Sequence, residues 1–170
     1  MPIVEAHGIS ALVPPGFEGR VFRRRRVADE DPRPVAHFAT FALPQRVGDF
    51  GGGAVERMGP TDLFVVLFEY GPDSVGSALF ARQGMPRRLR PEHFRPTVLR
   101  RGLADQAGSQ WFFTEAGRAF TLYAVLGSYA MRFILAPRLD PLLEGIVIDP
   151  SEVNDPVDAS PPAPTATRVP

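Results

Sequence analysis

The stretch GSQWFFTEAGRAFTLYAVLG (residues 108–127) predicts a β-hairpin, and with it an antiparallel sheet. Two apolar runs flank the sequence Thr-Glu-Ala-Gly, and Gly117 can adopt the positive φ that tight hairpin turns require. Side chains alternate between the two faces of a strand. In the second run one face therefore carries Phe120, Leu122, Ala124 and Leu126, and the other carries Thr121, Tyr123 and Val125.

Four more runs have the composition of strands, and they cover residues 3–14, 18–28, 34–44 and 61–71. The last of them, TDLFVVLFEYG, is the clearest because most of its residues are β-branched or aromatic. The run at 34–44 has small or apolar residues on both faces, which is typical of a strand covered on both sides. Gly8 in the first run is compatible with a bulge.

Helical signals are fewer. Residues 51–59 allow one or two turns, and residues 73–84 begin with a good N-cap, Asp73. Residues 136–148 predict a final helix, whose leucines and isoleucine recur at helical spacing. The sequence therefore predicts an α+β fold: a twisted antiparallel sheet of about six strands, two or three short flanking helices, and the last helix packed across one sheet face.

Two sequence motifs resemble PsbP-like/Mog1-like domains. ISALVPPGFEGRV (9–21) is similar to the strand, Pro-Gly-aromatic, strand opening of that family. WFFTEAGRAFTLYAVLG (111–127), followed by PRLDPLLEGIVI (137–148), is similar to its closing hairpin and C-terminal helix. The resemblance implies a twisted antiparallel sheet flanked by helices, on a scaffold used mainly to bind proteins or build assemblies. It implies no catalytic residues.

The chain divides into two parts. Residues 1–149 predict a single globular domain, whose length suits one substantial core. Residues 150–170 are rich in proline and acidic residues and contain no aromatic side chain. Such a segment buries too little apolar surface to offset its ordering entropy, so we expect a disordered C-terminal tail.

Composition excludes several classes of function. Basic and acidic residues number 19 each, so the net charge of zero argues against general nucleic-acid binding. The chain has no cysteine, which excludes thiolate metal sites and cysteine nucleophiles. The most apolar stretch, residues 118–137, is interrupted by Arg118, Gly127 and Arg132 and predicts no membrane span. No secretory signal opens the chain, and we expect a cytoplasmic protein.

Arginine is concentrated in two segments. The run RRRR at 23–26 is followed by Asp29, Glu30 and Asp31, and a solvated hairpin with compensated charge explains it. Residues 82–101 contain seven arginines against one acid, Glu92. This second segment is the better candidate for a charged site, although it is also compatible with a solvated connection whose arginines pair with acids elsewhere.

We therefore predict a partner-binding surface at Arg87, Arg88, Arg90, His93, Phe94 and Arg95, to which Phe50 and Trp111 add exposed aromatic anchors. Trp111 belongs to an aromatic cluster around the hairpin. That cluster forms an interface if one sheet face is exposed, and a second core if both faces are covered.

Motifs for catalysis or cofactor binding are missing. The glycines of GDFGGGAVE (48–56) lack the lysine of a phosphate-binding loop, because all 19 basic residues are arginine. His7, His37 and His93 lie too far apart in sequence to suggest a metal site, and His37 has the surroundings of a core histidine. We predict no catalytic residue, no metal and no cofactor.

The sequence thus favours a small non-catalytic binding or assembly protein that recognises a protein partner or a second copy of itself. An alternative is an enzyme whose site is assembled from scattered residues such as Glu69, His93, Glu115 and Arg118. A deep pocket lined by ionisable groups would favour the enzyme, and a shallow surface of arginines and aromatics would favour the binding protein.

Overall fold

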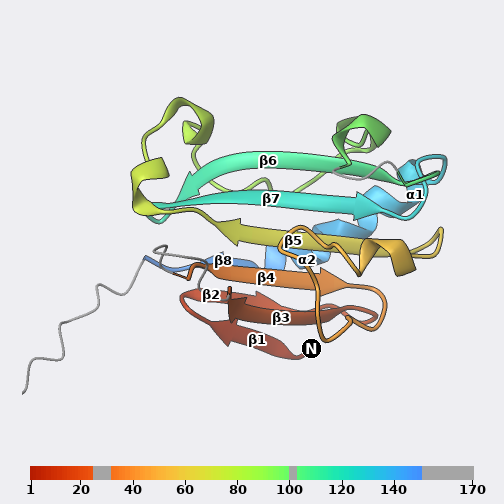
Figure 1. The fold of residues 1–170 in the computed structure, drawn as a ribbon, viewed down its shortest axis with the longest axis horizontal. Coiled ribbons are helices and arrows are strands. Elements are labelled where there is room, and N and C mark those ends of the chain that lie inside the picture. Colours follow the sequence, from red (N-terminus) through yellow and green to blue (C-terminus); the bar gives the residue numbers. More distant parts are fainter. Residues whose placement is uncertain (25–31, 100–102, 151–170) are drawn as a thin grey trace, which may run out of the picture.

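Two antiparallel sheets make up the fold (Figure 1). The computed structural model describes residues 1–24, 32–99 and 103–150. The larger sheet has five strands in the order β3-β4-β5-β7-β6, and the smaller one has three in the order β1-β2-β8. The α+β class and the antiparallel pairing are confirmed, whereas the prediction of one sheet of about six strands was wrong.

The larger sheet contains the predicted hairpin. Its strands are β3 (Glu18–Arg23), β4 (Pro34–Ala39), β5 (Leu63–Glu69), β6 (Ala107–Glu115) and β7 (Arg118–Leu126). The β6–β7 turn consists of Ala116 and Gly117, with φ of 53° and 72°. Positive φ at both turn residues matches the right-handed twist of the two strands, which is why glycine is favoured here.

The smaller sheet comes from the two ends of the domain. The run at 3–14, predicted as one strand with a bulge, folds back at His7 and Gly8 into β1 (Ile3–Ala6) and β2 (Ile9–Leu12). Both turn residues have positive φ, 55° and 68°, so Gly8 belongs to a tight turn and not to a bulge. β8 (Ile146–Ile148) pairs with β2, at residues predicted to end a helix.

Helical structure is short. α1 (Arg132–Leu135) and α2 (Asp140–Gly145) are joined by a 3₁₀ turn at Ala136–Leu139. Helical structure is therefore confirmed for 136–145 of the predicted 136–148, and it begins earlier than predicted, at Arg132. The helix predicted at 73–84 was wrong, because Gly76 has a φ of 82° and interrupts it. Other 3₁₀ turns are Pro72–Ser74, Ala78–Phe80, Pro91–His93, Pro96–Val98 and Val55–Arg57, the last within the predicted 51–59.

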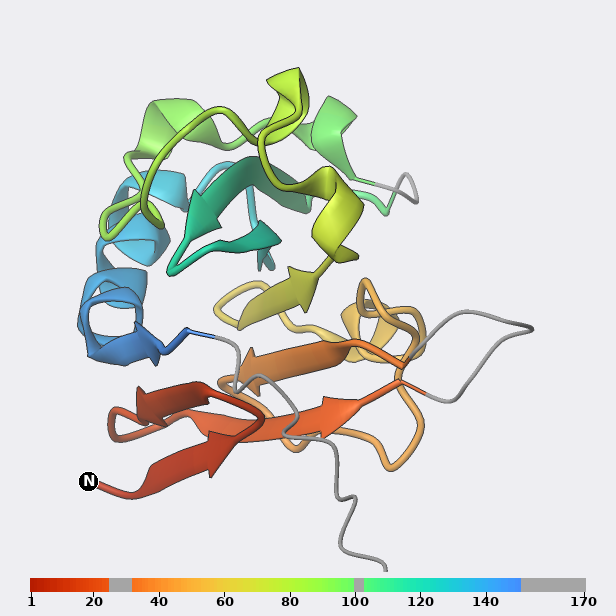
Figure 2. The same ribbon diagram turned by 90° about the vertical axis from the view of Figure 1, so that its left-hand side faces the viewer.

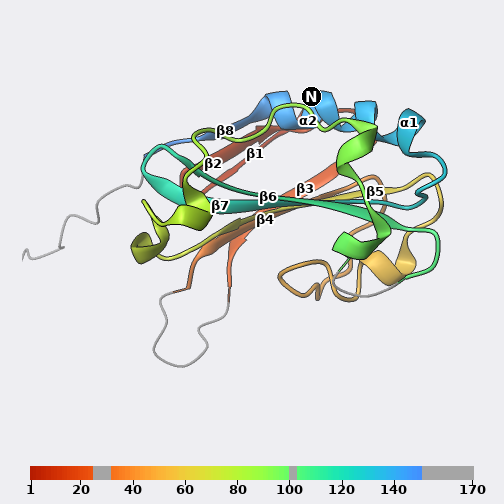
Figure 3. The ribbon, with the colours of Figure 1, turned by 90° about the horizontal axis from the view of Figure 1, so that it is seen from above.

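The five-stranded sheet separates two apolar cores. The smaller sheet, α1 and α2 cover one face, and connecting segments cover the other (Figures 2 and 3). Phe120, Leu122, Ala124 and Leu126 of β7 belong to the core under the helices, and Tyr123 and Val125 to the second core. The predicted division of the β7 faces is therefore confirmed.

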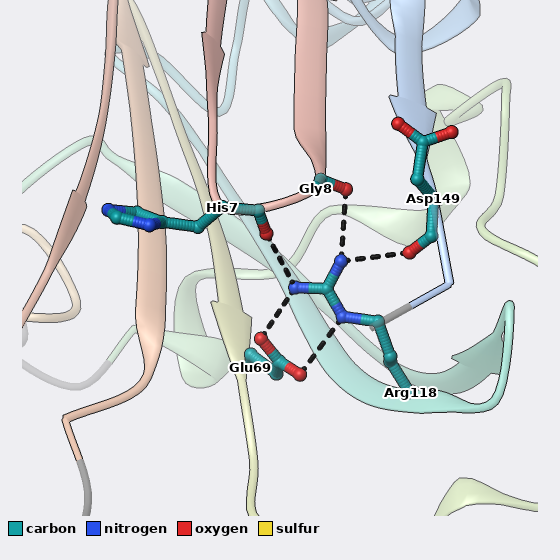
Figure 4. Close-up of polar contacts among 5 residues, drawn as sticks. All are labelled: His7, Gly8, Glu69, Arg118 and Asp149. Carbon is teal, nitrogen blue, oxygen red and sulfur yellow. Dashed lines mark hydrogen bonds and ion pairs between the residues drawn. The ribbon is translucent and has the colours of Figure 1, made fainter. Parts of the chain in front are cut away.

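Arg118 joins the two sheets (Figure 4). Its guanidinium donates to both carboxylate oxygens of Glu69, at 3.0 and 2.7 Å. It also donates to the carbonyl oxygens of His7, Gly8 and Asp149, at 2.9–3.0 Å. Arg118 and Glu69 are both buried, and all five donors of the guanidinium are used.

No helix among the described residues has the length and apolarity needed to cross a membrane. The predicted disorder of 150–170 concerns residues that, apart from Pro150, lie outside the described part of the chain.

The α2 helix supplies a direct test of the core beneath it. Leu142 and Leu143 are fully buried. Replacing either by alanine should lower the free energy of unfolding by about 2–5 kcal/mol, because each change removes buried methyl groups and leaves a cavity. Urea denaturation measures this loss. Leu79→Ala, at a 58% exposed leucine, is the control and should be near neutral. Near-neutral values for both core variants would contradict the packing of α2.

Removal of Arg118 tests the connection between the sheets. Arg118→Met should lower the free energy of unfolding by about 3–5 kcal/mol, because it leaves the buried Glu69 carboxylate without its counter-charge. The double variant Arg118→Met/Glu69→Leu should recover part of the loss, since it removes that carboxylate. A single-variant loss below about 1 kcal/mol, the value of a surface ion pair, would contradict this role.

Candidate functional site

The arginine-rich segment forms a border along the free edge of β6. Residues Arg82 and Gly84 exchange backbone hydrogen bonds with Thr114, and Arg95 exchanges two with Gly108. These bonds occupy edge groups that would otherwise be open to another strand. Residues 82–99 are therefore an ordered part of the domain, whereas Arg100 and Arg101 lie outside the described residues.

Arg87 is partly buried and is bonded within the domain. Its guanidinium donates to Glu115 at 2.7 Å and to the carbonyl oxygens of Leu143 and Ile146. Glu115 also accepts a hydrogen bond from the backbone N–H of Met85, at 2.8 Å. Arg87 thus connects the β6–β7 hairpin to the end of α2, and its guanidinium forms hydrogen bonds within the domain.

The other predicted partner-binding residues occupy different settings. Arg88, with 75% of its side chain exposed, pairs with Glu144 at 3.2 Å and reaches Asp140 at 4.0 Å. The His93 ring accepts a hydrogen bond from the backbone N–H of Arg90, whose side chain is exposed. The centres of the His93 and Trp111 rings lie 5.0 Å apart, in an edge-to-face arrangement.

The aromatic candidates are covered to different degrees. Phe94 is 1% exposed and belongs to the core under the helices. Phe50 is half-buried and stacks on Phe68 at 5.2 Å, beside a small hollow of about 220 Å³. Trp111 is also half-buried, with Arg82 over its ring at 5.2 Å. Phe113, Phe120 and Tyr123 of the aromatic cluster are buried core residues.

Arg95 is an exposed predicted residue that lines an open surface hollow. The hollow, of about 230 Å³, lies between the segment 91–95 and the beginning of α1. Tyr129, Arg132 and Phe133 form its other side. We call these groups, Arg95, Tyr129, Arg132 and Phe133, together with the adjacent Ile134, the α1 surface.

The α1 surface combines exposed apolar groups with positive charge. Phe133 is 62% exposed and Ile134 is 65% exposed. The Arg132 guanidinium lies between two rings, 4.2 Å from that of Tyr129 and 4.6 Å from that of Phe133. Within the described residues, no carboxylate pairs with Arg95 or Arg132. The arrangement can therefore accept both an apolar side chain and a carboxylate.

Sequence reasoning did not connect Arg95 with Tyr129, Arg132 and Phe133. The motif SYAMRF (128–133) does place two aromatic residues and an arginine close together, a combination enriched at interfaces. Its exposure, however, depends on how α1 packs, and a local pattern does not encode that packing.

Of the four residues named for the alternative enzyme, Glu69 and Arg118 form an ion pair with each other, whereas Glu115 and His93 contact residues outside that set. Glu115 bonds Arg87, and His93 contacts Trp111. Among the described residues, no group of three or more histidine, aspartate or glutamate side chains could hold a metal ion. Comparisons with protein-family models, with curated proteins and with solved structures found no match.

His37 is buried on β4 between the rings of Phe22 and Phe64. Its Nε2 lies 3.2 Å from the backbone oxygen of Asp49, and its Nδ1 has no partner among the described residues. Burial lowers the pKa of His37 to about 4, opposed by the contact with the Asp49 backbone and reinforced by the charge of Arg20. The ring is therefore neutral at pH 7.

This histidine should make stability depend on pH. Between the ordinary value of 6.5 and about 4, the unfolded chain binds a proton at residue 37 and the folded chain does not. Stability should therefore be full above pH 6.5 and fall by about 3 kcal/mol as the pH drops through that window. Urea melts at several pH values measure the slope. His37→Gln should reduce it, and an unchanged slope would contradict the assignment.

Proposed function

We propose that this chain is a non-catalytic binding domain that recognises a protein partner through the α1 surface. The observation that carries the proposal is the exposure of Phe133 and Ile134 beside two arginines without carboxylate partners. That absence refers to residues 1–24, 32–99 and 103–150.

Aromatic residues and arginine are enriched at protein interfaces because each covers a large area and contributes directional contacts. Phe133 and Ile134 are adjacent, exposed apolar side chains on the four-residue helix α1. A partner that covers them removes apolar surface from water, which is favourable. The hollow beside them gives one partner side chain a place to insert.

Charge indicates the chemistry of the partner. Arg95 and Arg132 line the hollow together with Glu92, so positive charge exceeds negative charge there. A segment with an apolar residue next to one or two carboxylates complements this arrangement, because guanidinium groups bind carboxylates through paired hydrogen bonds. We therefore propose an acidic segment of another protein, with an apolar side chain for the hollow.

The proposal keeps part of the sequence-based expectation. The arginine-rich segment contributes through Arg95, while Arg87 and Arg88 have carboxylate partners within the domain. The PsbP-like/Mog1-like assignment rests on its two sequence motifs and agrees with a binding role. A cytoplasmic location likewise remains a prediction from the sequence.

Selection from a random peptide library tests the function, because the library presents many candidate sequences and no partner has to be chosen in advance. Peptides selected on the full chain should be enriched in aspartate or glutamate next to a large apolar residue. Their affinity should fall at least about tenfold for Phe133→Ala, since exposed aromatic anchors dominate interface energies. Arg132→Glu should also weaken binding, by reversing the charge that meets the carboxylates.

Two variants on other surfaces serve as matched controls. Leu79→Ala removes an exposed apolar side chain, and Arg57→Glu reverses an exposed arginine. Both should leave peptide affinity unchanged. Equal losses in the control and α1-surface variants, or selected peptides without acidic residues, would contradict the proposal.

A further inference from the structure

A second hollow, of about 610 Å³, lies at the opposite edge of the large sheet, beside β3. Arg20 and Phe22 of β3 line it, together with Arg24 just after the strand. The segment 45–49 closes the other side. Its volume falls within the range of sites that hold small molecules.

Two of the arginines are held in place by the fold. Arg20 donates from Nη1 to the carbonyl oxygen of Pro44 at 2.9 Å, and its guanidinium lies over the Phe22 ring at 5.5 Å. The Arg24 guanidinium lies 4.4 Å from the centre of the Phe68 ring and reaches Asp49 at 3.5 Å. Their positions are therefore set before any ligand arrives.

The charge of the hollow is poorly balanced. Arg20, Arg23, Arg24 and Arg46 line it with one carboxylate, Asp49, so four positive charges and one negative charge leave +3 among its described residues. In the part of the chain that the structure describes, Arg20 has no carboxylate partner. Partly buried positive charge without a counter-ion is unfavourable, and a bound anion would offset that cost.

Unused donors show where an anion would bind. The Nε atoms of Arg20 and Arg24 are buried and have no acceptor among the described residues. The Nη2 groups of the same residues have no described acceptor either, and they are not buried. These two Nη2 groups can therefore donate to a ligand in the hollow, and the exposed Arg46 can approach it from the segment opposite.

We propose that this hollow binds a small phosphate-bearing molecule. Several guanidinium groups around one space suit a group with three acceptor oxygens and a charge near −2, and a single carboxylate would leave most of the charge unbalanced. Phe22 and Val47 offer apolar contact to the rest of the ligand. The site is separate from the α1 surface and does not depend on the function proposed for it.

The proposed phosphate site includes residues of the arginine run at 23–26, whereas the sequence analysis favoured residues 82–101 as the charged site. Arg23 and Arg24 belong to the run at 23–26, for which the sequence suggested compensation by Asp29, Glu30 and Asp31. Those three acids, with Arg25 and Arg26, lie outside the described residues. Because they are present in the full chain, the test below is made on the full chain.

Calorimetric titration of the full chain with pyrophosphate at low ionic strength tests the proposal. Wild-type protein should bind pyrophosphate, and it should bind malonate, a dicarboxylate of similar size, at least about tenfold more weakly. Arg46→Gln and Arg24→Gln should each weaken pyrophosphate binding about tenfold, because each removes charge-assisted hydrogen bonds. Arg57→Gln, at an exposed arginine on another surface, should leave it unchanged.

Three results would overturn the proposal. Absence of binding at pyrophosphate concentrations up to about 10 mM would exclude even a very weak affinity. It would mean that acidic groups of the chain itself neutralise the positive charge of these arginines. Equal weakening by Arg57→Gln would mean diffuse attraction to charge, and equal affinity for malonate would remove the preference for phosphate. Circular dichroism checks the fold of each variant, and Arg46→Gln, at an exposed side chain, keeps the test valid if Arg24→Gln does not fold.

Discussion

The hydrogen bonds of Arg118 hold the two sheets in their relative position. A guanidinium buried at the beginning of β7 binds Glu69 at the end of β5 and three carbonyl oxygens from the β1–β2 turn and the residue after β8. Only arginine carries five donors in a planar fork, so lysine could not make the same set of bonds. The core under the helices lies between the sheets that this residue connects.

Arginine has several structural roles in this protein, in which it supplies all 19 basic residues. Arg118 and Arg87 bind carboxylates and carbonyls inside the domain. Arg88 pairs with acids at the surface. Arg20, Arg95 and others have no described carboxylate partner. The surrounding structure distinguishes these roles, since the side chain itself is the same and stays charged.

The two proposed binding regions lie at opposite edges of one sheet. The α1 surface adjoins the segment that borders β6, and the arginine hollow adjoins β3, with three strands between these edges. Neither region shares a lining residue with the other. A protein partner at one region would therefore leave the other region open to a small anion.

The sequence by itself determined the β6–β7 hairpin, β5 and the two faces of β7, because turn residues and alternating side chains are local signals. It missed the division of residues 3–14, since His7 takes the first place of the two-residue turn with a positive φ, where asparagine or aspartate is the usual signal. It also predicted a helix at 73–84 that the backbone at Gly76 interrupts.

Only the tertiary structure decided which arginines are available to a ligand. Arg118 meets His7, which is 111 positions away, and Arg87 meets Glu115, which is 28 positions away. No local pattern encodes such distances. Whether a guanidinium has an acceptor depends on which carboxylate or carbonyl the fold brings within hydrogen-bond distance. A guanidinium without such an acceptor is available to bind a ligand.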